Sequence, residues 1–248
     1  MIEKTWAALL HMGVNMWSDV PPEHWGNYNP SGRKDDRKDD SFENHFDETL
    51  WREVTGKMQQ AGMNMIVIDI GEALVYPSHP ELAERGSWSP DRLRAELNRL
   101  RKMGLEPIPK LNFSTGHDIW LKEYSRLVST PEYYRVCEDV IRDVWEVFDH
   151  PRLFHLGYDE EQHKAQKRFD YCVIRQGELW WKDFMWFVRK VEGLDMRPWI
   201  WSDYAWDHPE EFMQRMPRSV LQSNWYYDFA FDPAKTSKEQ KHILKFYV

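Results

Sequence analysis

Three consecutive carboxylates stand directly after a short apolar run at residues 152–158. They are Asp159, Glu160 and Glu161, and Gly157 precedes them. A buried parallel strand delivers acids in this way to the mouth of an α/β barrel, where active sites lie. Neighbouring residues on a regular strand face opposite ways, so Asp159 and Glu160 can reach one site only where the strand ends. The pattern predicts acid–base chemistry by these two carboxylates.

Further polar and aromatic side chains fall at the ends of other expected strands. The candidates for contact with a substrate are Asp69, Asn112, His117, His155, Trp199, Trp201, Asp203, Trp225 and Tyr226. Alternatives stay open for three of them: His155 could be a satisfied core histidine, His117 could cap a loop, and Asp69 could cap a helix or loop. Aromatic side chains fill cores but also stack on the apolar faces of sugar rings, and the chain has 14 Trp. Carboxylates and aromatics at one end of the strands favour a carbohydrate substrate.

A repeated unit of helix, glycine and strand must position these residues. The pattern occurs at Gly62, Gly104 and Gly193, and each glycine is expected to take the left-handed conformation that ends a helix. Alternating strands and helices imply parallel strands joined by right-handed crossovers. Strands are expected near 6–12, 64–70, 105–112, 152–158, 196–202 and 219–225, and helices near 47–61, 90–103, 131–148, 177–192, 208–215 and 236–247.

This alternation predicts an α/β fold of the (β/α)8 TIM-barrel type, with residues 1–248 as a single catalytic domain. About six strand–helix units can be counted, whereas such a barrel has eight. The last helical pattern, from Lys238 to Val248, is still amphipathic where the sequence stops. We therefore expect the barrel to be incomplete, without its C-terminal strands. A six-stranded open α/β sheet is the structural alternative.

Composition argues against several classes of protein. The net charge of −8 disfavours nucleic acid as a partner, and no run of about 18 apolar residues could span a membrane. Two cysteines without metal-ligand spacing, and no His-x-His or His-Glu-x-x-His pattern, predict no metal and no cofactor. The N-terminus shows no signal peptide, so the location is unknown: cytoplasmic as the sequence stands, periplasmic or secreted if a leader was removed. The oligomeric state stays open.

The stretch from His155 to Glu160, with the sequence HLGYDE, resembles the His-x-Gly-Gly-Asp-Glu signature of glycoside hydrolase family 20, the β-N-acetylhexosaminidases. Residues 86–89, 104–109 and 116–117 resemble the run into the family's third strand and its Pro-Gly-His turn. The strand ends at 199–203 and 222–225 resemble its fifth and sixth.

The chain also departs from the family's pattern. Tyr158 stands in place of the second glycine of the signature, and Thr115 in place of the proline of the turn. The first strand carries no arginine of the kind that grips sugar hydroxyls in the family. We expect Tyr158 to alter the pocket.

The resemblance implies substrate-assisted, retaining hydrolysis of a terminal N-acetylhexosamine in an oligosaccharide or glycoconjugate. Glu160 would protonate the glycosidic oxygen and later activate water. Asp159 would orient the 2-acetamido group, whose carbonyl oxygen attacks the anomeric carbon. Such a mechanism requires a protonated Glu160 and an ionised Asp159. Trp199, Trp201 and Trp225 would enclose the acetamido methyl group.

Two other functions remain open at this stage. A glycosidase acting on sugars without an acetamido group would use Glu160 as the acid and Asp69, Asp203 or Glu161 as nucleophile or base. The distance between the carboxyl groups would decide between retaining and inverting chemistry. A non-catalytic barrel could instead bind carbohydrate through its aromatic side chains alone.

Overall fold

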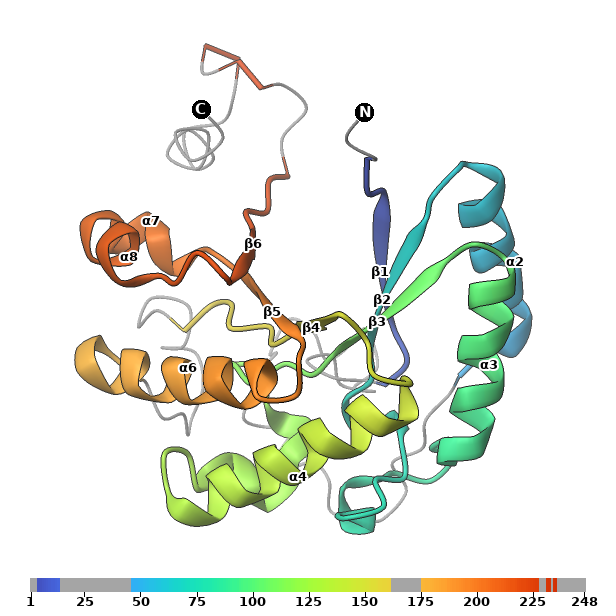
Figure 1. The fold of residues 1–248 in the computed structure, drawn as a ribbon, viewed down its shortest axis with the longest axis horizontal. Coiled ribbons are helices and arrows are strands. Elements are labelled where there is room, and N and C mark those ends of the chain that lie inside the picture. Colours follow the sequence, from blue (N-terminus) through green and yellow to red (C-terminus); the bar gives the residue numbers. More distant parts are fainter. Residues whose placement is uncertain (1–3, 14–45, 162–174, 228–230, 233, 236–248) are drawn as a thin grey trace, which may run out of the picture.

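The computed structural model describes residues 4–13, 46–161, 175–227, 231–232 and 234–235. Within these residues, six parallel strands form one sheet that curls into a half-barrel (Figure 1). The strands are β1 (Ala7–His11), β2 (Met65–Asp69), β3 (Glu106–Lys110), β4 (Leu153–His155), β5 (Arg197–Trp201) and β6 (Leu221–Ser223). Each lies inside the range expected from the sequence. The helix expected at 236–247 falls outside the described residues.

The order of the strands in the sheet is their order in the chain. This sequential order is that of a β/α barrel, whereas in doubly wound sheets the order of the strands reverses at a switch point. The register sets His11 beside Asp69, Asp69 beside Lys110, and Lys110 beside His155. A row of polar residues therefore crosses four neighbouring strands at one level. The α/β class is confirmed, in the form of a half-barrel.

Helices lie on the outer side of the curled sheet (Figure 1). They are α2 (Glu48–Gln60), α3 (Pro90–Lys102), α4 (Pro131–Val147), α6 (Gly177–Glu192), α7 (Tyr204–Asp207) and α8 (Pro209–Arg215). Asp47, Ser89 and Thr130 each accept a hydrogen bond from a backbone N–H in the first turn of the helix that follows. Such caps fix where a helix begins because they satisfy an N–H without a partner in the helix.

Short turns that were not expected lie in the loops after the strands. They are the 3-10 segments η2 (Gly71–Ala73), η3 (Pro80–Leu82) and η4 (Ile119–Arg126), together with the four-residue helix α7. Segments of this length have too little periodicity to be recognised in a sequence.

The glycines that end the helices differ from the expectation at one of the three positions. Gly62 and Gly104 are left-handed, with φ of 77° and 79°. Gly193 is right-handed, with φ of −63°, and its N–H donates to Arg189 O at 2.9 Å. The helical path therefore continues past Gly193, and the left-handed residue is Asp195, with φ of 58°. The expectation for Gly193 is wrong because another residue takes the position that ends the helix.

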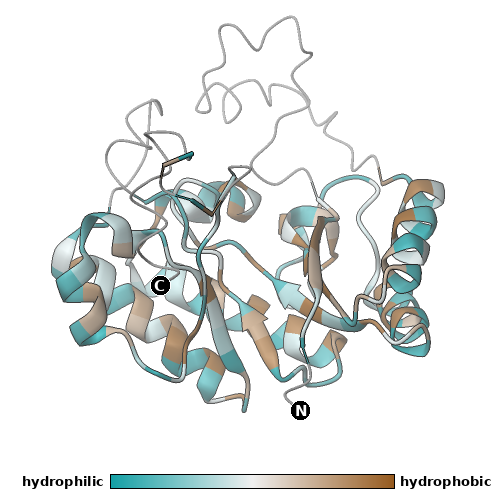
Figure 2. Cartoon of the chain, turned by 90° about the horizontal axis from the view of Figure 1, so that it is seen from above, coloured by the Kyte–Doolittle hydropathy of each residue, from teal (hydrophilic) through white to brown (hydrophobic). Residues whose placement is uncertain are grey.

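Two apolar layers follow from the period of two along the strands. Ile66 and Ile68 face the helices and join the larger core, whereas Met65 and Val67 face the inside of the curl with Ile108. Figure 2 shows that the helices alternate between hydrophobic and hydrophilic positions. Among the described helices, none combines the length and the apolar character needed to cross a bilayer.

Candidate functional site

The backbone turns sharply after β4, where the candidate carboxylates begin. The φ angle is 73° at Gly157, 71° at Tyr158 and 57° at Glu160, all in the left-handed region. A Cβ atom on Gly157 would lie 2.0 Å from Asn112 Oδ1, so glycine alone fits there. The turn ends the alternation of the strand, and this allows consecutive side chains to approach one site.

The side chain of Tyr158, which follows Gly157 in the turn, points toward the helices. Its ring is buried and packs edge-on against Trp180 and Phe187 of α6, with centroids 5.5 and 5.8 Å apart. The left-handed conformation costs a non-glycine residue about 1–2 kcal/mol. Burial of the phenol ring in the core offsets that cost, at about 1.5–3 kcal/mol for a large apolar side chain. The turn directs the ring of Tyr158 toward the helices, and its effect on the pocket stays a prediction.

Asp159 and Glu160 meet at the imidazole of His117, in the loop after β3. The Nε2 atom of His117 lies 3.1 Å from Glu160 Oε2 and 3.5 Å from Asp159 Oδ2. Burial by itself would lower the pKa of His117, but the charge of Asp159 and the hydrogen bond to Glu160 raise it above its ordinary value. Three ionisable side chains therefore lie together, with both carboxylates within contact distance of His117.

The loop after β3 also holds Asp159. Asn112 Nδ2 donates to Asp159 Oδ1 at 2.9 Å, and the hydroxyl of Ser114 donates to the main-chain oxygen of Asp159. The side chain of Asp159 is 17% exposed and that of Glu160 is 46% exposed. The structure thus brings the predicted residues Asn112 and His117 to the two carboxylates. Ser114 was missed, although its place just after a strand was an available signal.

Asp203 joins this group from the end of β5. Its Oδ2 atom accepts the backbone N–H of Glu160 at 2.9 Å, and its side chain is buried. A carboxylate that receives a backbone N–H fixes the position of that peptide group. Asp203 therefore lies against the turn that carries Glu160, as its place at a strand end predicted.

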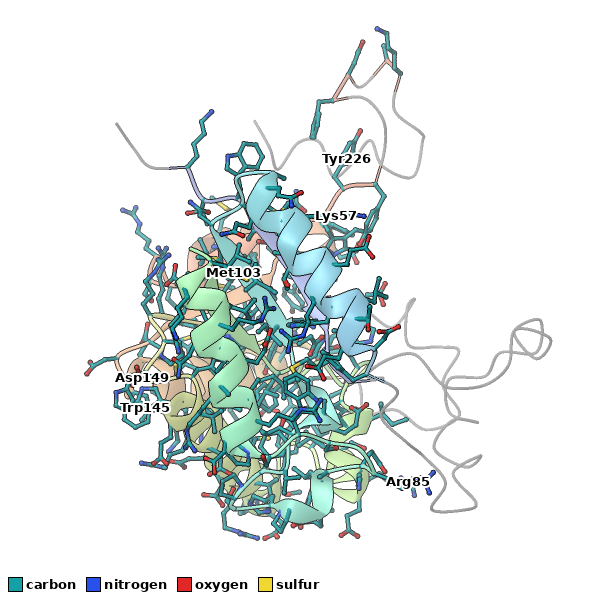
Figure 3. All side chains as sticks on the ribbon, turned by 90° about the vertical axis from the view of Figure 1, so that its right-hand side faces the viewer. Lys57, Arg85, Met103, Trp145, Asp149 and Tyr226 are labelled. Carbon is teal, nitrogen blue, oxygen red and sulfur yellow. The ribbon has the colours of Figure 1, made fainter. Side chains whose placement is uncertain are left out.

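Trp225 and Tyr226 follow β6 and pack among other aromatic side chains. The Trp225 ring lies 4.3 Å from Trp206 of α7, and Tyr226 stacks with Phe231 at 5.0 Å. Figure 3 shows Tyr226 at one end of the molecule, far from Arg85 in the loop after β2. That Trp225 and Tyr226 contact the substrate stays a prediction.

Asp69 belongs to the polar row on the inner face of the sheet. The ammonium of Lys110 contacts its carboxylate, and His11 Nδ1 lies 3.1 Å from Asp69 Oδ2. Burial would raise the pKa of Asp69, but the charges of Lys110 and His11 together lower it to about 2. Lys110 was missed, although it stands two residues before Asn112 and so shares its face of the strand.

His155 lies in the same row, under two tryptophan rings. The centroids of Trp199 and Trp201 are each 5.0 Å from the His155 ring, which is fully buried. The Nδ1 atom accepts the Gly157 N–H at 3.0 Å, so the neutral ring carries its proton on Nε2. Burial, with the charge of Lys110, lowers the pKa of His155 well below its ordinary value. The ring is therefore buried and neutral, but its Nε2 atom has no hydrogen-bond partner among the described residues, so contact of His155, Trp199 and Trp201 with a substrate stays a prediction.

Glu161 turns into a buried ion pair with Arg175 instead of joining the other two carboxylates. Arg175 was missed because nothing in its local sequence marks a buried arginine. Its partner lies 14 residues earlier in the chain.

No family model matches the sequence, and no curated protein matches it. Solved structures with a similar fold include a β-N-acetylhexosaminidase from Bacteroides fragilis, with a TM-score of 0.58 and 12% identity over 82% of this chain and 44% of that chain. A mutant β-hexosaminidase from Streptomyces plicatus, in complex with N-acetylglucosamine, has a TM-score of 0.59 and 11% identity over 97% and 45%.

A family 20 exo-β-N-acetylglucosaminidase from Vibrio harveyi, in complex with N-acetylglucosamine, gives a TM-score of 0.56 and 13% identity over 74% of this chain and 36% of that chain. The chain spans less than half the length of these proteins. Identities this low establish the fold alone. The resemblance to family 20 glycoside hydrolases, which the sequence between His155 and Glu160 suggested, is confirmed at that level.

Proposed function

We propose that the protein is a glycoside hydrolase that cleaves terminal N-acetylhexosamine by substrate-assisted, retaining hydrolysis. The observation that carries the proposal is the convergence of Asp159 and Glu160 on His117, at the carboxyl end of a parallel sheet. The similarity of fold to β-N-acetylhexosaminidases supports it. A (β/α)8 barrel, of which the six described strands are a part, belongs to the same proposal.

Glu160 is the general acid in this scheme. Its half-exposed side chain can reach a bound substrate, whereas a fully buried carboxyl could not. It gives its proton to the glycosidic oxygen as the bond from that oxygen to the anomeric carbon breaks. In the second step the Glu160 carboxylate takes a proton from water, and the oxygen of that water attacks the same carbon as the bond from this carbon to the acetamido oxygen breaks.

Asp159 acts on the acetamido group of the substrate. The hydrogen bond from Asn112 holds its carboxylate in place, and this carboxylate can accept the acetamido N–H. The acetamido carbonyl oxygen then bonds to the anomeric carbon opposite the leaving group and forms a positive oxazolinium ring. The negative charge of Asp159 stabilises that ring. Two displacements at one carbon retain its configuration.

His117 determines which group holds the acidic proton. With one proton between them, His117 and Glu160 exist either as an ion pair or as a neutral pair with the proton on Glu160. A substrate that excludes water disfavours the ion pair, because charges are costly in a medium of low dielectric constant. Substrate binding would therefore move the proton to Glu160, where the first step needs it.

A second candidate is a glycosidase that uses two protein carboxylates. Asp203 is the better partner for Glu160, because it accepts the Glu160 backbone N–H. Asp69 and Glu161 are held in buried ion pairs, which makes them poor nucleophiles. A carbohydrate-binding protein without catalysis is a third possibility, in which Trp199 and Trp201 stack on sugar.

The test compares hydrolysis of an aryl N-acetyl-β-glucosaminide with that of an aryl β-glucoside. We expect cleavage of the first substrate alone, with kcat reduced on the order of 100- to 10,000-fold by Glu160→Gln. Glu53→Gln, in an exposed ion pair on α2, is the control and should keep full activity. Cleavage of the glucoside alone would support the two-carboxylate reaction. Unchanged hydrolysis by Glu160→Gln would remove Glu160 as the acid.

A further inference from the structure

A buried cluster of charged side chains lies behind the carboxylates of the candidate site. The guanidinium of Arg175 contacts the carboxylates of Glu161 and Asp183, and it donates to the main-chain oxygen of Phe113 at 2.7 Å. It also lies over the ring of Tyr158, 4.8 Å from the centroid. Arg175, Glu161 and Asp183 are called the Arg175 cluster below.

Strong electrostatic forces hold this cluster together. All three side chains are buried, and Asp183 also accepts hydrogen bonds from the hydroxyls of Ser129 and Tyr134. Burial would lower the pKa of Arg175, but the charge of Glu161 raises it well above its ordinary value, so the guanidinium stays charged. Removing one member of a buried ion pair leaves a charge without compensation. The geometry of the cluster is therefore strongly determined.

Glu161 connects the cluster to the candidate site. It directly follows Glu160 in the chain, and its Oε1 atom accepts the backbone N–H of Thr115 at 2.7 Å. Thr115 stands two residues before His117, in the same turn. The main-chain oxygen of Glu161 accepts a hydrogen bond from Gln176 Nε2 at 3.2 Å. Through its side chain and its main-chain oxygen, Glu161 thus joins the turn after β4, the loop that carries His117 and the start of α6.

The position of Glu160 depends on this backbone. Its side chain is half exposed, and its φ of 57° is unfavourable for a residue other than glycine. Such a conformation persists only when the surrounding structure over-determines it. Asp203 holds the peptide N–H of Glu160 on one side, and the buried side chain of Glu161 anchors the chain on the other.

We propose that Glu161 and Arg175 are positioning residues that hold Glu160 beside His117 by fixing the turn after β4. The catalytic consequence rests on the proposed function, whereas the effect on His117 does not. Neither residue contacts the substrate in this scheme. A displacement of the acid by about 1 Å can lower kcat on the order of 100-fold. Replacing Glu161 or Arg175 should therefore lower kcat much more than it changes KM.

The first test follows the titration of His117 by NMR in Glu161→Gln, with the signal assigned from its loss in His117→Gln. The variant keeps the size of the side chain but removes the charge that binds Arg175. We expect the pKa of His117 to fall toward its ordinary value, because Glu160 moves away. Glu96→Gln is the matched control, since Glu96 is a buried partner of Arg99 on α3. It should leave the His117 titration unchanged.

A second variant, Arg175→Lys, tests the same positioning of Glu160 beside His117 if Glu161→Gln does not fold. Lysine keeps the charge but lacks the planar fork that reaches Glu161, Asp183 and Phe113 O together. The same fall in the His117 pKa is expected, with kcat on the aryl N-acetylglucosaminide reduced at least tenfold. If wild-type protein hydrolyses no such substrate, the proposed function fails, and the His117 titration still tests the positioning. A folded variant with the wild-type His117 titration would overturn the inference.

Discussion

Replacing Lys110 by methionine should remove the ammonium group that compensates the buried charge of Asp69. The pKa of Asp69 is lowered from 3.8 to about 2, which at about 1.4 kcal/mol per pKa unit corresponds to about 2–3 kcal/mol of stability at neutral pH. Breaking a buried ion pair by removing one partner typically costs about 3–5 kcal/mol. We therefore expect Lys110→Met to lower the free energy of unfolding by about 3 kcal/mol at pH 7.

The stability lost in Lys110→Met should become smaller as the pH falls. In the wild type, the pKa of Asp69 is lowered by folding, so its contribution is fully present above about pH 4 and is lost as pH falls toward 2. Without Lys110, burial raises the pKa of Asp69 instead, and the folded variant favours the protonated acid. The difference between wild type and Lys110→Met should therefore shrink from pH 7 to pH 4.

Urea unfolding at pH 4, 5, 6 and 7 measures this difference. Lys57→Met, which removes one partner of an exposed ion pair on α2, is the control and should change stability by less than about 0.5 kcal/mol. Adding Asp69→Asn to Lys110→Met should recover part of the loss, because the uncompensated charge is gone. A loss below about 1 kcal/mol at pH 7, or one that is equal at pH 4 and pH 7, would refute the reasoning.

Three further predictions concern single residues. Gly157→Ala should destabilise the protein by more than about 2 kcal/mol in urea unfolding, since its Cβ would overlap Asn112 and φ is positive; an effect below about 0.5 kcal/mol would contradict this. Ser89→Ala removes the cap of α3 and should cost about 1 kcal/mol, seen as a lower Tm, whereas Ser89→Asp should not. The raised pKa of His117 means that its charge stabilises the fold below about pH 6.5, and that this stabilisation is lost as pH rises through the folded pKa. His117→Gln should therefore destabilise more at pH 6 than at pH 9 in unfolding experiments, and an equal loss at both would exclude this assignment.

The elements of this fold could be predicted from local sequence. All six strands fall within their expected ranges, and α3 and α4 begin at the Ser-Pro and Thr-Pro sites that marked them. These signals are local because capping and period-two alternation act over a few residues. The expectation failed at Gly193, where Asp195 takes the left-handed position, because the two residues compete within one turn.

The candidate site was predictable only in part. Asn112, His117 and Asp203 were selected because they follow strands, and they do surround the turn after β4. Lys110 and Arg175 were missed, since buried cations are rare and each depends on a carboxylate far away in sequence. No pattern of hydrophobicity signals such a pair.

By itself the sequence determined the alternation of strands and helices, and hence that the carboxylates would stand at the carboxyl end of a parallel sheet. It also contained the HLGYDE stretch, which suggested a resemblance that the fold bears out. Tertiary structure alone decided that the ring of Tyr158 faces the helices, that Glu161 turns away from Glu160, and that His117 lies between two carboxylates. The reason is physical: propensity and periodicity act between neighbours in the chain, whereas charge compensation, burial and backbone strain are settled by residues brought together only when the sheet curls.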